Sequence, residues 1–421
     1  MSGMQEDSLP SLAGQDWLHD PALQSVLAAL GGGEEGLTRI VGGAVRNALF
    51  DRPVKDIDLA TRVPPEQVLA KSGRAGLKAV PTGIDHGTVT VIAHGRPFEV
   101  TTLRLDLETY GRHALVVFTD DWKEDARRRD FTINALYADA EGRVFDPLGG
   151  YRDIAARRVR FIGDADARLG EDYLRILRFF RLHAEYGEGA LDAEGLAACV
   201  RARHGLAQLS AERLGQETRR LMQADEPLSA VTAMVETGIS LDLFAGVAYL
   251  GPFAHLLRIE AALGLDIDAT LRLAVLGCAV AEDADRLNTR LRLSRAEHQR
   301  LVAASEHWWE MTPALPEADR KHALYRAGRG TFTDRVLASW ARRGGAMDDP
   351  GWKALYRLPE RWRVPELPWR GADLRQRGIK GGPHVGTILR AAEERWIACG
   401  FPTAKEELDV LIEEAIAAGG E

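Results

Sequence analysis

The first part of the chain alternates apolar and polar residues with the two-residue period of β-strands. Between residues 37 and 165, such runs occupy 38–43, 56–61, 87–93, 96–104, 144–150 and 158–163. Helical spacing interrupts them at 44–50 and 64–71. We therefore expect a mixed sheet with flanking helices in this part of the chain.

The spacing changes to a helical period after Arg168. Apolar residues recur every three or four positions in 171–187, 210–222, 227–238, 269–281, 296–309 and a last segment that ends at 420. The whole pattern predicts an α+β protein in five parts. These are an N-terminal tail and helix at 1–36, a head at 37–165, a neck at 166–225, a helical body at 226–319 and a helical tail at 320–421.

Charge is distributed unevenly along the 421 residues. The net charge of −8 disfavours nucleic-acid binding if the chain is taken as a whole, yet residues 320–390 hold 16 Lys or Arg against 6 Asp or Glu. Trp340, Trp352 and Trp362 are among the aromatic residues interleaved with these cations. Such a segment is typical of a surface that binds a phosphate backbone, but solvated helix faces have the same composition.

Two other classes of protein are disfavoured. The cysteines Cys199, Cys278 and Cys399 lie far apart, so we expect neither a disulfide framework nor a zinc site. The longest apolar stretch, 272–281, is shorter than the roughly 20 residues of a membrane-spanning helix, and the first ten residues lack a basic region followed by an apolar one. We expect a cytoplasmic protein without membrane contact.

A double glycine separates the first predicted strand from the first helical segment of the head. Gly42 and Gly43 let backbone N–H groups approach an anion without side-chain obstruction, and Arg46 adds positive charge beside them. A tight strand-to-helix turn without any ligand would have the same sequence. The glycines alone therefore leave both interpretations open.

Two aspartates open the second predicted strand. Residues i and i+2 of a strand face the same side, so Asp56 and Asp58 project together while Ile57 and Leu59 face the core. Neighbouring carboxylates repel each other unless a cation lies between them, and oxygen ligands of this kind suit Mg²⁺. For these two residues alone, a chance surface pair is the alternative.

A third acid, Glu99, lies within the apolar alternation of 96–104, where an unpaired charge is costly. Its strand is expected to form a hairpin with 87–93 through a turn at His94 and Gly95. Three carboxylates on adjacent strands beside a phosphate-binding turn are typical of two-metal nucleotidyl transfer. One metal then activates the attacking hydroxyl while the other stabilises the leaving pyrophosphate.

Six motifs, in the same order, resemble those of the class II tRNA nucleotidyltransferases, the CCA-adding enzymes and their bacterial poly(A) polymerase relatives. They lie between residues 37 and 225 and read GGAVRNALFDRPVKDIDLAT, PFEVTTLR, RRRDFTINAL, DPLGGYRDI, EDYLRILRFFRLHAEYG and ERLGQE. The resemblance implies a polymerase-β-like head and an enzyme that uses CTP, ATP and Mg²⁺ to extend the 3' end of tRNA. One departure is Asn47, where the family often has an aspartate.

The resemblance also implies roles for residues in RRRDFTINAL, which we expect at the start of a helix. Asp130 would accept a hydrogen bond from the ribose 2'-hydroxyl, Arg129 would lie near the phosphates, and Asn134 would belong to the same nucleotide-binding motif. The connection at 105–126 resembles the mobile loop of the family.

The segment 171–187 predicts one helix with Glu171, Asp172, Arg175 and Arg178 on one face. An ordinary salt-bridged surface has the same spacing. Asp172 supplies only acceptors and Arg175 only donors, which together complement the amino group and ring nitrogen of cytosine and adenine but not of uracil or guanine. In the resembling family these positions bind the incoming base, and Glu171 would orient Arg175.

The main hypothesis is therefore CCA addition to tRNA, with the acceptor stem and elbow on the basic tail. Candidate RNA-binding residues there are Arg342, Arg343, Arg375 and Lys380. A poly(A) polymerase is the alternative, although that relative often carries a strongly basic C-terminal extension and this chain finishes KEELDVLIEEAIAAGGE. An enzyme adding only CC or only A is a further alternative, and the full acid set disfavours a catalytically silent RNA-binding protein.

Overall fold

The computed structural model describes residues 9–33, 35–110, 113–380 and 382–419. They form two compact units. The first contains residues 1–248 and 286–293, and the second contains 249–285 and 294–421. Within the described part of the chain, no helix is long and apolar enough to cross a membrane.

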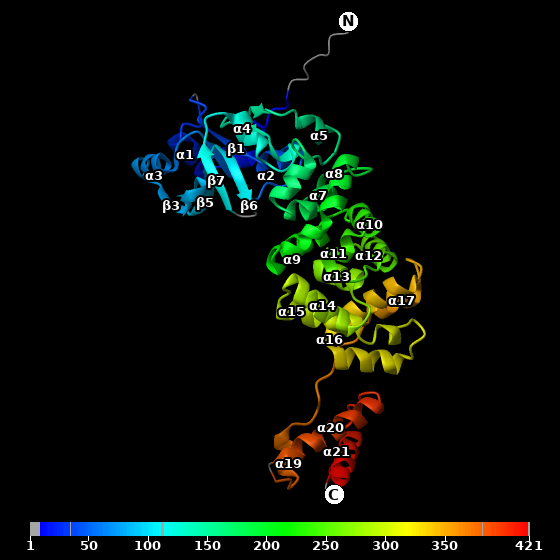
Figure 1. Cartoon of the computed structure of the whole chain (residues 1–421). Coiled ribbons are helices and arrows are strands. Elements are labelled where there is room, and N and C mark those ends of the chain that lie inside the picture. The colour runs from blue at the N-terminus through cyan, green and yellow to red at the C-terminus, as the bar shows by residue number, and fades with distance from the viewer. Residues whose placement is uncertain (1–8, 34, 111–112, 381, 420–421) are drawn as a thin grey trace. The chain divides into compact units, whose positions relative to one another are not determined.

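A seven-stranded sheet forms the head of the first unit (Figure 1). Its strands are β1 (Thr38–Val41), β2 (Asp58–Thr61), β3 (Lys78–Gly83), β4 (Thr88–Ala93), β5 (Arg96–Thr102), β8 (Tyr137–Ala138) and β9 (Val144–Phe145). They lie in the order β3-β4-β5-β2-β1-β8-β9. Only the β2–β5 pair is parallel among these described strands. The mixed sheet confirms the predicted α+β class.

Short helices flank the sheet as predicted. These are α1 (Pro21–Ala29), α2 (Gly43–Leu49) and α3 (Pro65–Arg74). Asp20 accepts a hydrogen bond from the backbone N–H of Ala22 and so caps α1. Helices α1 and α3 pack against β4, and α2 packs against β1. The α2 contact matters for function because it fixes the glycine turn at the end of β1.

One prediction for the head was wrong. The segment 158–163 is not a strand, and only a bridge between Phe131 and Phe161 links it to the chain around the third motif. The connection at 105–126, which resembles the mobile loop of the family, contains most of a hairpin, β6 (Arg104–Tyr110) and β7 (His113–Phe118), followed by α4 (Trp122–Arg127). Residues 111 and 112 of that connection lie outside the described residues.

Helices complete the first unit. They are α5 (Tyr151–Ala155), α6 (Ala165–Glu171), α7 (Leu174–Tyr186), α8 (Ala193–Ala202), α9 (Ala211–Met222), α10 (Leu228–Glu236) and α11 (Ile239–Phe244). Helix α7 packs against α9 and α10 and buries Phe179 and Phe180. Its opposite side therefore stays free to present polar residues.

The second unit is helical. Its helices are α12 (Leu250–Leu263), α13 (Ala269–Gly277), α15 (Arg295–Ser305), α16 (Glu317–Arg343), α17 (Pro350–Tyr356), α18 (Leu358–Arg361), α19 (Gly371–Gln376), α20 (Pro383–Ala398) and α21 (Lys405–Gly419), and α14 (Ala281–Leu291) contributes residues to both units. Helix α16 packs on α12, α13 and α15, and a separate apolar cluster around Trp396 joins α19, α20 and α21. The predicted border at residue 320 falls inside α16.

Candidate active site

The glycine turn opens the site. Gly42 follows β1 with φ +69° and ψ −119°, a conformation that L side chains rarely adopt, and α2 begins at the next residue. A Cβ atom built on Gly42 would lie 3.6 Å from Nη1 of Arg129. The turn therefore presents bare backbone beside a guanidinium group, as a phosphate-binding turn requires.

The two aspartates of the motif line the same cleft as this turn. Asp56 precedes β2, Asp58 is its first residue, and the buried Ile57 and Leu59 confirm the predicted alternation. In the parallel register, Asp58 lies opposite Glu99 of β5. Asp58 exposes part of its surface to the cleft, but burial of the rest raises its pKa. The charge of Glu99 raises that pKa further, and Arg129 opposes the shift.

The predicted trio does not assemble as one group. Glu99 is not among the residues that line the cleft. In the described part of the chain, no three His, Cys, Asp or Glu side chains converge closely enough to hold a metal ion. The pair of Asp56 and Asp58 nevertheless fits a hard divalent cation, because both are oxygen donors and the raised pKa of Asp58 reflects a charge that lacks compensation.

The segment around Asp130 differs from the prediction. Its three arginines lie at the end of α4 and beyond it rather than at the start of a helix. Their positive charges therefore interact favourably with the negative end of the helix dipole. Asp130 follows in a bend, then comes the extended Phe131, and the short 3₁₀ helix η3 (Thr132–Asn134) begins after it. Arg178 of α7 donates from Nε to Asp130 Oδ2 at 2.7 Å, and Asn134 donates to Oδ1 at 3.0 Å.

Asp130 is thereby held as an anion. Burial alone would raise its pKa, but the charge of Arg178 and the hydrogen bond from Asn134 lower it to about 2. Arg129 next to it is held by Asp125, whose Oδ2 accepts a hydrogen bond from Arg129 Nη2 at 3.0 Å. Asp130 and Arg129 thus line the cleft with side chains that hydrogen bonds and ion pairs hold in place.

Asp172 marks a break between two helices. The sequence predicted one helix through Glu171, Asp172 and Arg175, but α6 ends at Glu171 and α7 begins at Leu174. Asp172 has φ −157° and ψ 108°, and its Oδ1 accepts from the backbone N–H of Leu174 at 3.1 Å. The acceptor and the donor therefore come from separate elements rather than from one helix face.

Each member of this pair has a fixed partner. Arg213 of α9 donates from Nη2 to Asp172 Oδ2 at 2.6 Å. Glu171 accepts a short hydrogen bond from Nη1 of Arg175, the contact that the resemblance implied. Among the described residues, Arg175 makes hydrogen bonds only through Nη1, so its Nη2 and Nε can still donate toward the cleft.

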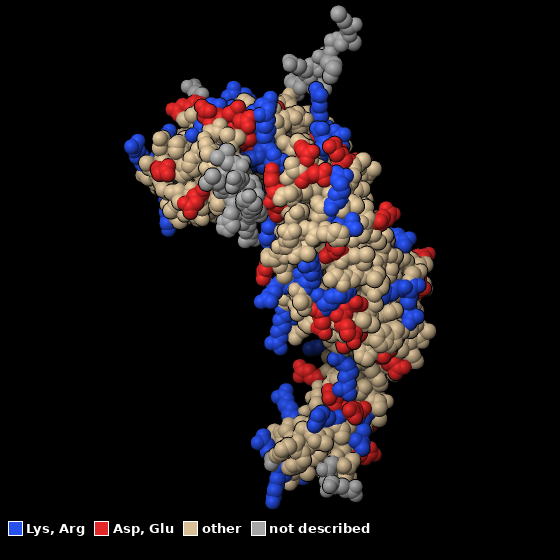
Figure 2. Space-filling view, viewed as in Figure 1, with Lys and Arg blue, Asp and Glu red and all other residues tan. Residues whose placement is uncertain are grey.

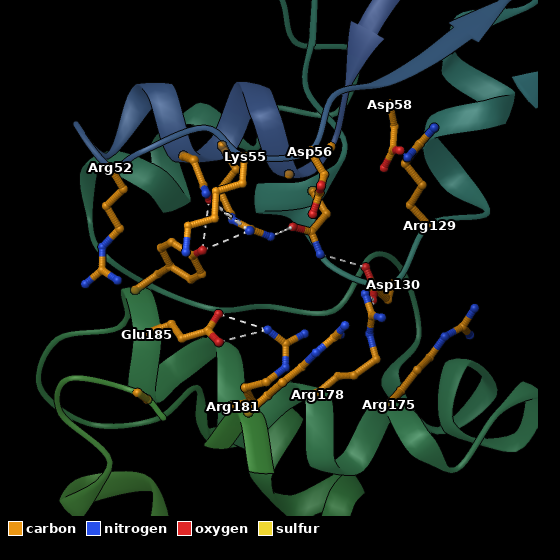
Figure 3. A pocket seen from close by; sticks show the side chains of 18 of the residues that line it. Arg52, Lys55, Asp56, Asp58, Arg129, Asp130, Arg175, Arg178, Arg181 and Glu185 are labelled. Carbon is orange, nitrogen blue, oxygen red and sulfur yellow. Dashed lines mark hydrogen bonds and ion pairs between the residues drawn. The ribbon is translucent and has the colours of Figure 1, made fainter. Parts of the chain in front are cut away.

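All these elements surround a cleft of about 940 Å³ in the first unit. Figure 3 shows Arg175, Arg178 and Arg181 projecting from α7 toward the loop that carries Lys55 and Asp56. Ten Lys or Arg and six Asp or Glu line it, so the cleft is cationic. The predicted residues that it brings together are Gly42, Gly43, Arg46, Asp56, Asp58, Arg129, Asp130, Asn134, Asp172, Arg175 and Arg178, whereas Glu99 and Glu171 are not part of this lining.

Known proteins share these features. Residues 38–160 match the family model described as the poly A polymerase head domain, and residues 190–250 match the model of a probable RNA and SrmB-binding site of polymerase A. The chain is 33% identical to the mitochondrial CCA tRNA nucleotidyltransferase 1 of Mus musculus over 375 residues, which cover 88% of this chain and 85% of that protein. The chain belongs to the class II CCA-adding tRNA nucleotidyltransferase family.

Other members of this family extend the likeness. The CCA-adding enzyme of Bacillus velezensis is 31% identical over 87% of this chain and 91% of its own length. The crystal structure of the Bacillus stearothermophilus CCA-adding enzyme in complex with CTP has a TM-score of 0.73 and 27% identity, and the match covers 95% of this chain and 99% of that one. Members of the family are metal-dependent nucleotidyltransferases.

The predicted RNA-binding residues of the second unit separate into two groups. Arg342 donates to the carbonyl groups of Cys278 at 2.6 Å and Ala304 at 2.8 Å, and burial lowers its pKa to about 10. It joins three helices of the unit, which favours a structural role, and its part in RNA binding stays an untested prediction. Arg343 is exposed, with Nη2 donating to the carbonyl of Trp309.

Arg375 and Lys380 lie differently. Both are exposed, and no hydrogen bond or ion pair occupies their side chains within the described part of the chain. Figure 2 shows Lys and Arg side chains projecting from the part of the chain that carries α19. These two residues keep the geometry that a phosphate-backbone contact needs.

Arg213, Tyr186 and Lys55 are among the cleft residues that the sequence reasoning missed. Arg213 lies in the ERLGQE motif, but its contact with Asp172 spans 41 positions and has no local signal. Tyr186 is the last residue of α7, and its contacts with Arg46 and Asn47 cross about 140 positions of the chain. Lys55 precedes Asp56 and Asp58 in DRPVKDID, and its charge beside two acids was the one available clue.

Proposed function

We propose that this protein adds CCA to the 3' end of tRNA, taking CTP and ATP and releasing pyrophosphate without a nucleic-acid template. The observation that carries the proposal is that two pairs of residues with different chemical roles line one cleft. A carboxylate pair, Asp56 and Asp58, shares it with the acceptor Asp172 and the donor Arg175. The first pair suits nucleotidyl transfer, and the second suits the edge that cytosine and adenine have in common.

The triphosphate would lie against the glycine turn. Gly42, Gly43 and the guanidinium groups of Arg46 and Arg129 line that part of the cleft, and Gly43 begins helix α2 there. Asp130, kept ionised by Arg178, would accept from the ribose 2'-hydroxyl and so favour ribonucleotides. These roles rest on the positions of the residues and on the resemblance of their motifs.

Asp56 and Asp58 would hold Mg²⁺. Glu99 lies opposite Asp58 on β5, and its charge would add to the negative potential at the ion. When bound, the ions of a two-metal site lower the pKa of the attacking 3'-hydroxyl and neutralise charge that develops on the leaving pyrophosphate. Two carboxylates leave coordination positions open for water and substrate phosphates, which Mg²⁺ prefers.

A direct experiment uses a tRNA transcript that lacks its terminal CCA. The purified protein receives labelled CTP and ATP, separately and together, and a transcript ending in CCA serves as the control. We expect C, C and A to be added in that order and nothing to be added to the control. A long A tail would instead identify a poly(A) polymerase, and addition of only CC or only A would identify a partial enzyme.

The cytoplasmic location stays part of the proposal. The Mus musculus relative is a mitochondrial protein, so microscopy of a fluorescently tagged full chain in its own cells would be the test.

A further inference from the structure

A buried guanidinium group lies at the centre of the cleft. Arg46 donates from Nη1 to Asn134 Oδ1 at 2.5 Å and from Nη2 to the Tyr186 hydroxyl at 2.9 Å. Its Nε and Nη2 also donate to Asn47 Oδ1, at 3.3 and 3.0 Å. All of these partners are neutral.

Neutral partners are unusual for a buried arginine, which is normally paired with a carboxylate. Among the described residues, Arg46 has no ion pair with any Asp or Glu. Its contacts therefore fix the guanidinium plane without a carboxylate partner, and Glu185, whose charge acts on Arg46 from a distance, is itself paired with Arg181. An anion that enters the cleft would supply an anionic partner.

Asn47 and Tyr186 form the fixed part of this arrangement. The Tyr186 hydroxyl accepts from Arg46 and donates to Asn47 Oδ1 at 2.9 Å, and the Tyr186 ring lies 4.2 Å from the Arg46 guanidinium carbon. Asn47 also donates from Nδ2 to the carbonyl of Pro53 at 3.0 Å. An aspartate could not make that last bond, because a carboxylate has no donor.

We propose that Asn47 and Tyr186 are positioning residues that hold Arg46 by neutral contacts, so that its full charge is available to the nucleotide triphosphate. This inference rests on the proposed function and explains why an amide stands where the family often has an acid. An aspartate at position 47 would accept the same bonds from Arg46 and Tyr186 but would neutralise the cation. Asn47 and Tyr186 fix the orientation of the Arg46 guanidinium group without neutralising its positive charge.

Two variants test the two parts of the proposal. Tyr186→Phe keeps the ring and removes the hydroxyl, and Asn47→Asp keeps the acceptor and adds a negative charge. We expect each to raise KM for CTP and for ATP by about tenfold, the effect of one hydrogen bond to a charged group. We expect kcat and the order of addition to change little, because Asp172, Arg175 and the metal-binding pair are untouched.

Inhibition by inorganic tripolyphosphate gives a readout that involves no base. Its inhibition constant should rise in parallel with both KM values. Tyr325→Phe, which removes a hydroxyl bonded to Glu393 in the second unit, and Asn288→Asp, which adds a charge on α14, are the matched controls and should leave all these constants unchanged.

The proposal is overturned if either variant keeps wild-type KM and tripolyphosphate inhibition, or if kcat falls together with the fraction of folded protein while KM stays constant. Failure of the proposed function is a different outcome, because wild-type protein would then add no nucleotide to the shortened tRNA. Calorimetric titration of tripolyphosphate into the wild type and both variants would still test the neutral contacts in that case.

Discussion

Asp58 of β2 and Glu99 of β5 lie directly opposite each other in a parallel strand pair. Like charges in such positions repel, and the charge of Arg129 offsets this repulsion only in part, because the pKa of Asp58 stays raised. The arrangement is unfavourable for folding and favourable for binding a divalent ion. It therefore links the stability of the metal-free protein to its activity.

Asp58→Asn should separate these two properties. We expect the variant to lose nucleotide incorporation while the metal-free protein melts at the same or a higher temperature than wild type, because the repulsion is removed. Gel assays of CTP and ATP incorporation and calorimetric melting in the presence of EDTA are the measurements. Residual incorporation close to the wild-type rate would refute the metal assignment.

The raised pKa of Asp58 predicts how pH acts on metal binding. A folded-state pKa above the ordinary value of about 4 means that the metal-free protein gains stability as pH falls through that raised pKa. Mg²⁺ needs the ionised carboxylate, so its affinity should begin to fall as pH drops through the raised pKa and should continue to fall below it. Titration calorimetry at several pH values would show this fall.

Glu99→Gln provides the check on that pH effect. Burial is the largest cause of the raised pKa of Asp58, and the charge of Glu99 is the second. The variant removes that second cause, so the loss of Mg²⁺ affinity should move to lower pH. An unchanged profile would mean that another group controls the titration.

Arg213→Met should loosen the choice of nucleotide. Arg213 is the side-chain partner of Asp172, and without it the carboxylate can rotate away from the base edge. We expect discrimination against UTP to fall by about tenfold, since the lost contact is a charge-assisted hydrogen bond. Arg201→Met is the matched control, because Arg201 forms an exposed ion pair with Asp166 in the same unit. Equal discrimination in both variants would contradict a role in base selection.

The basic residues of the second unit should divide by function. Arg342→Met should lower the free energy of unfolding by about 2 kcal/mol, because buried carbonyl groups lose their donor, and leave tRNA affinity unchanged. Arg375→Ala with Lys380→Ala should do the reverse. It should weaken tRNA binding and reduce its dependence on salt by about one to two phosphate contacts, with no change in melting temperature.

Filter-binding titrations at several salt concentrations, paired with urea denaturation, would measure both effects. A wild-type salt dependence in the Arg375 and Lys380 variant would place the tRNA surface elsewhere.

Local patterns predicted the parts of the site that local physics determines. The alternation around Asp58 placed that carboxylate correctly because its neighbours Ile57 and Leu59 must be buried. The glycine turn could also be predicted from the sequence, because the positive φ of residue 42 favours a glycine there. In both cases the information lies within a few residues of the feature.

The features that could not be predicted from the sequence depend on contacts between residues that are far apart along the chain. Helical spacing continues through Asp172, and only the bond from Arg213 and the bond to the Leu174 N–H show why the chain breaks there. Tyr186 and Asn47 are separated by 139 positions, so neither residue signals the other. Arg342 looked like a surface cation because its carbonyl partners lie on other helices.

The cationic cleft has a consequence for substrate capture at long range. The chain carries a net charge of −8, yet ten Lys or Arg against six acids line this one cavity. The positive potential of the cavity attracts nucleoside triphosphates. A molecule whose net charge would otherwise repel them can therefore capture its small anionic substrate quickly.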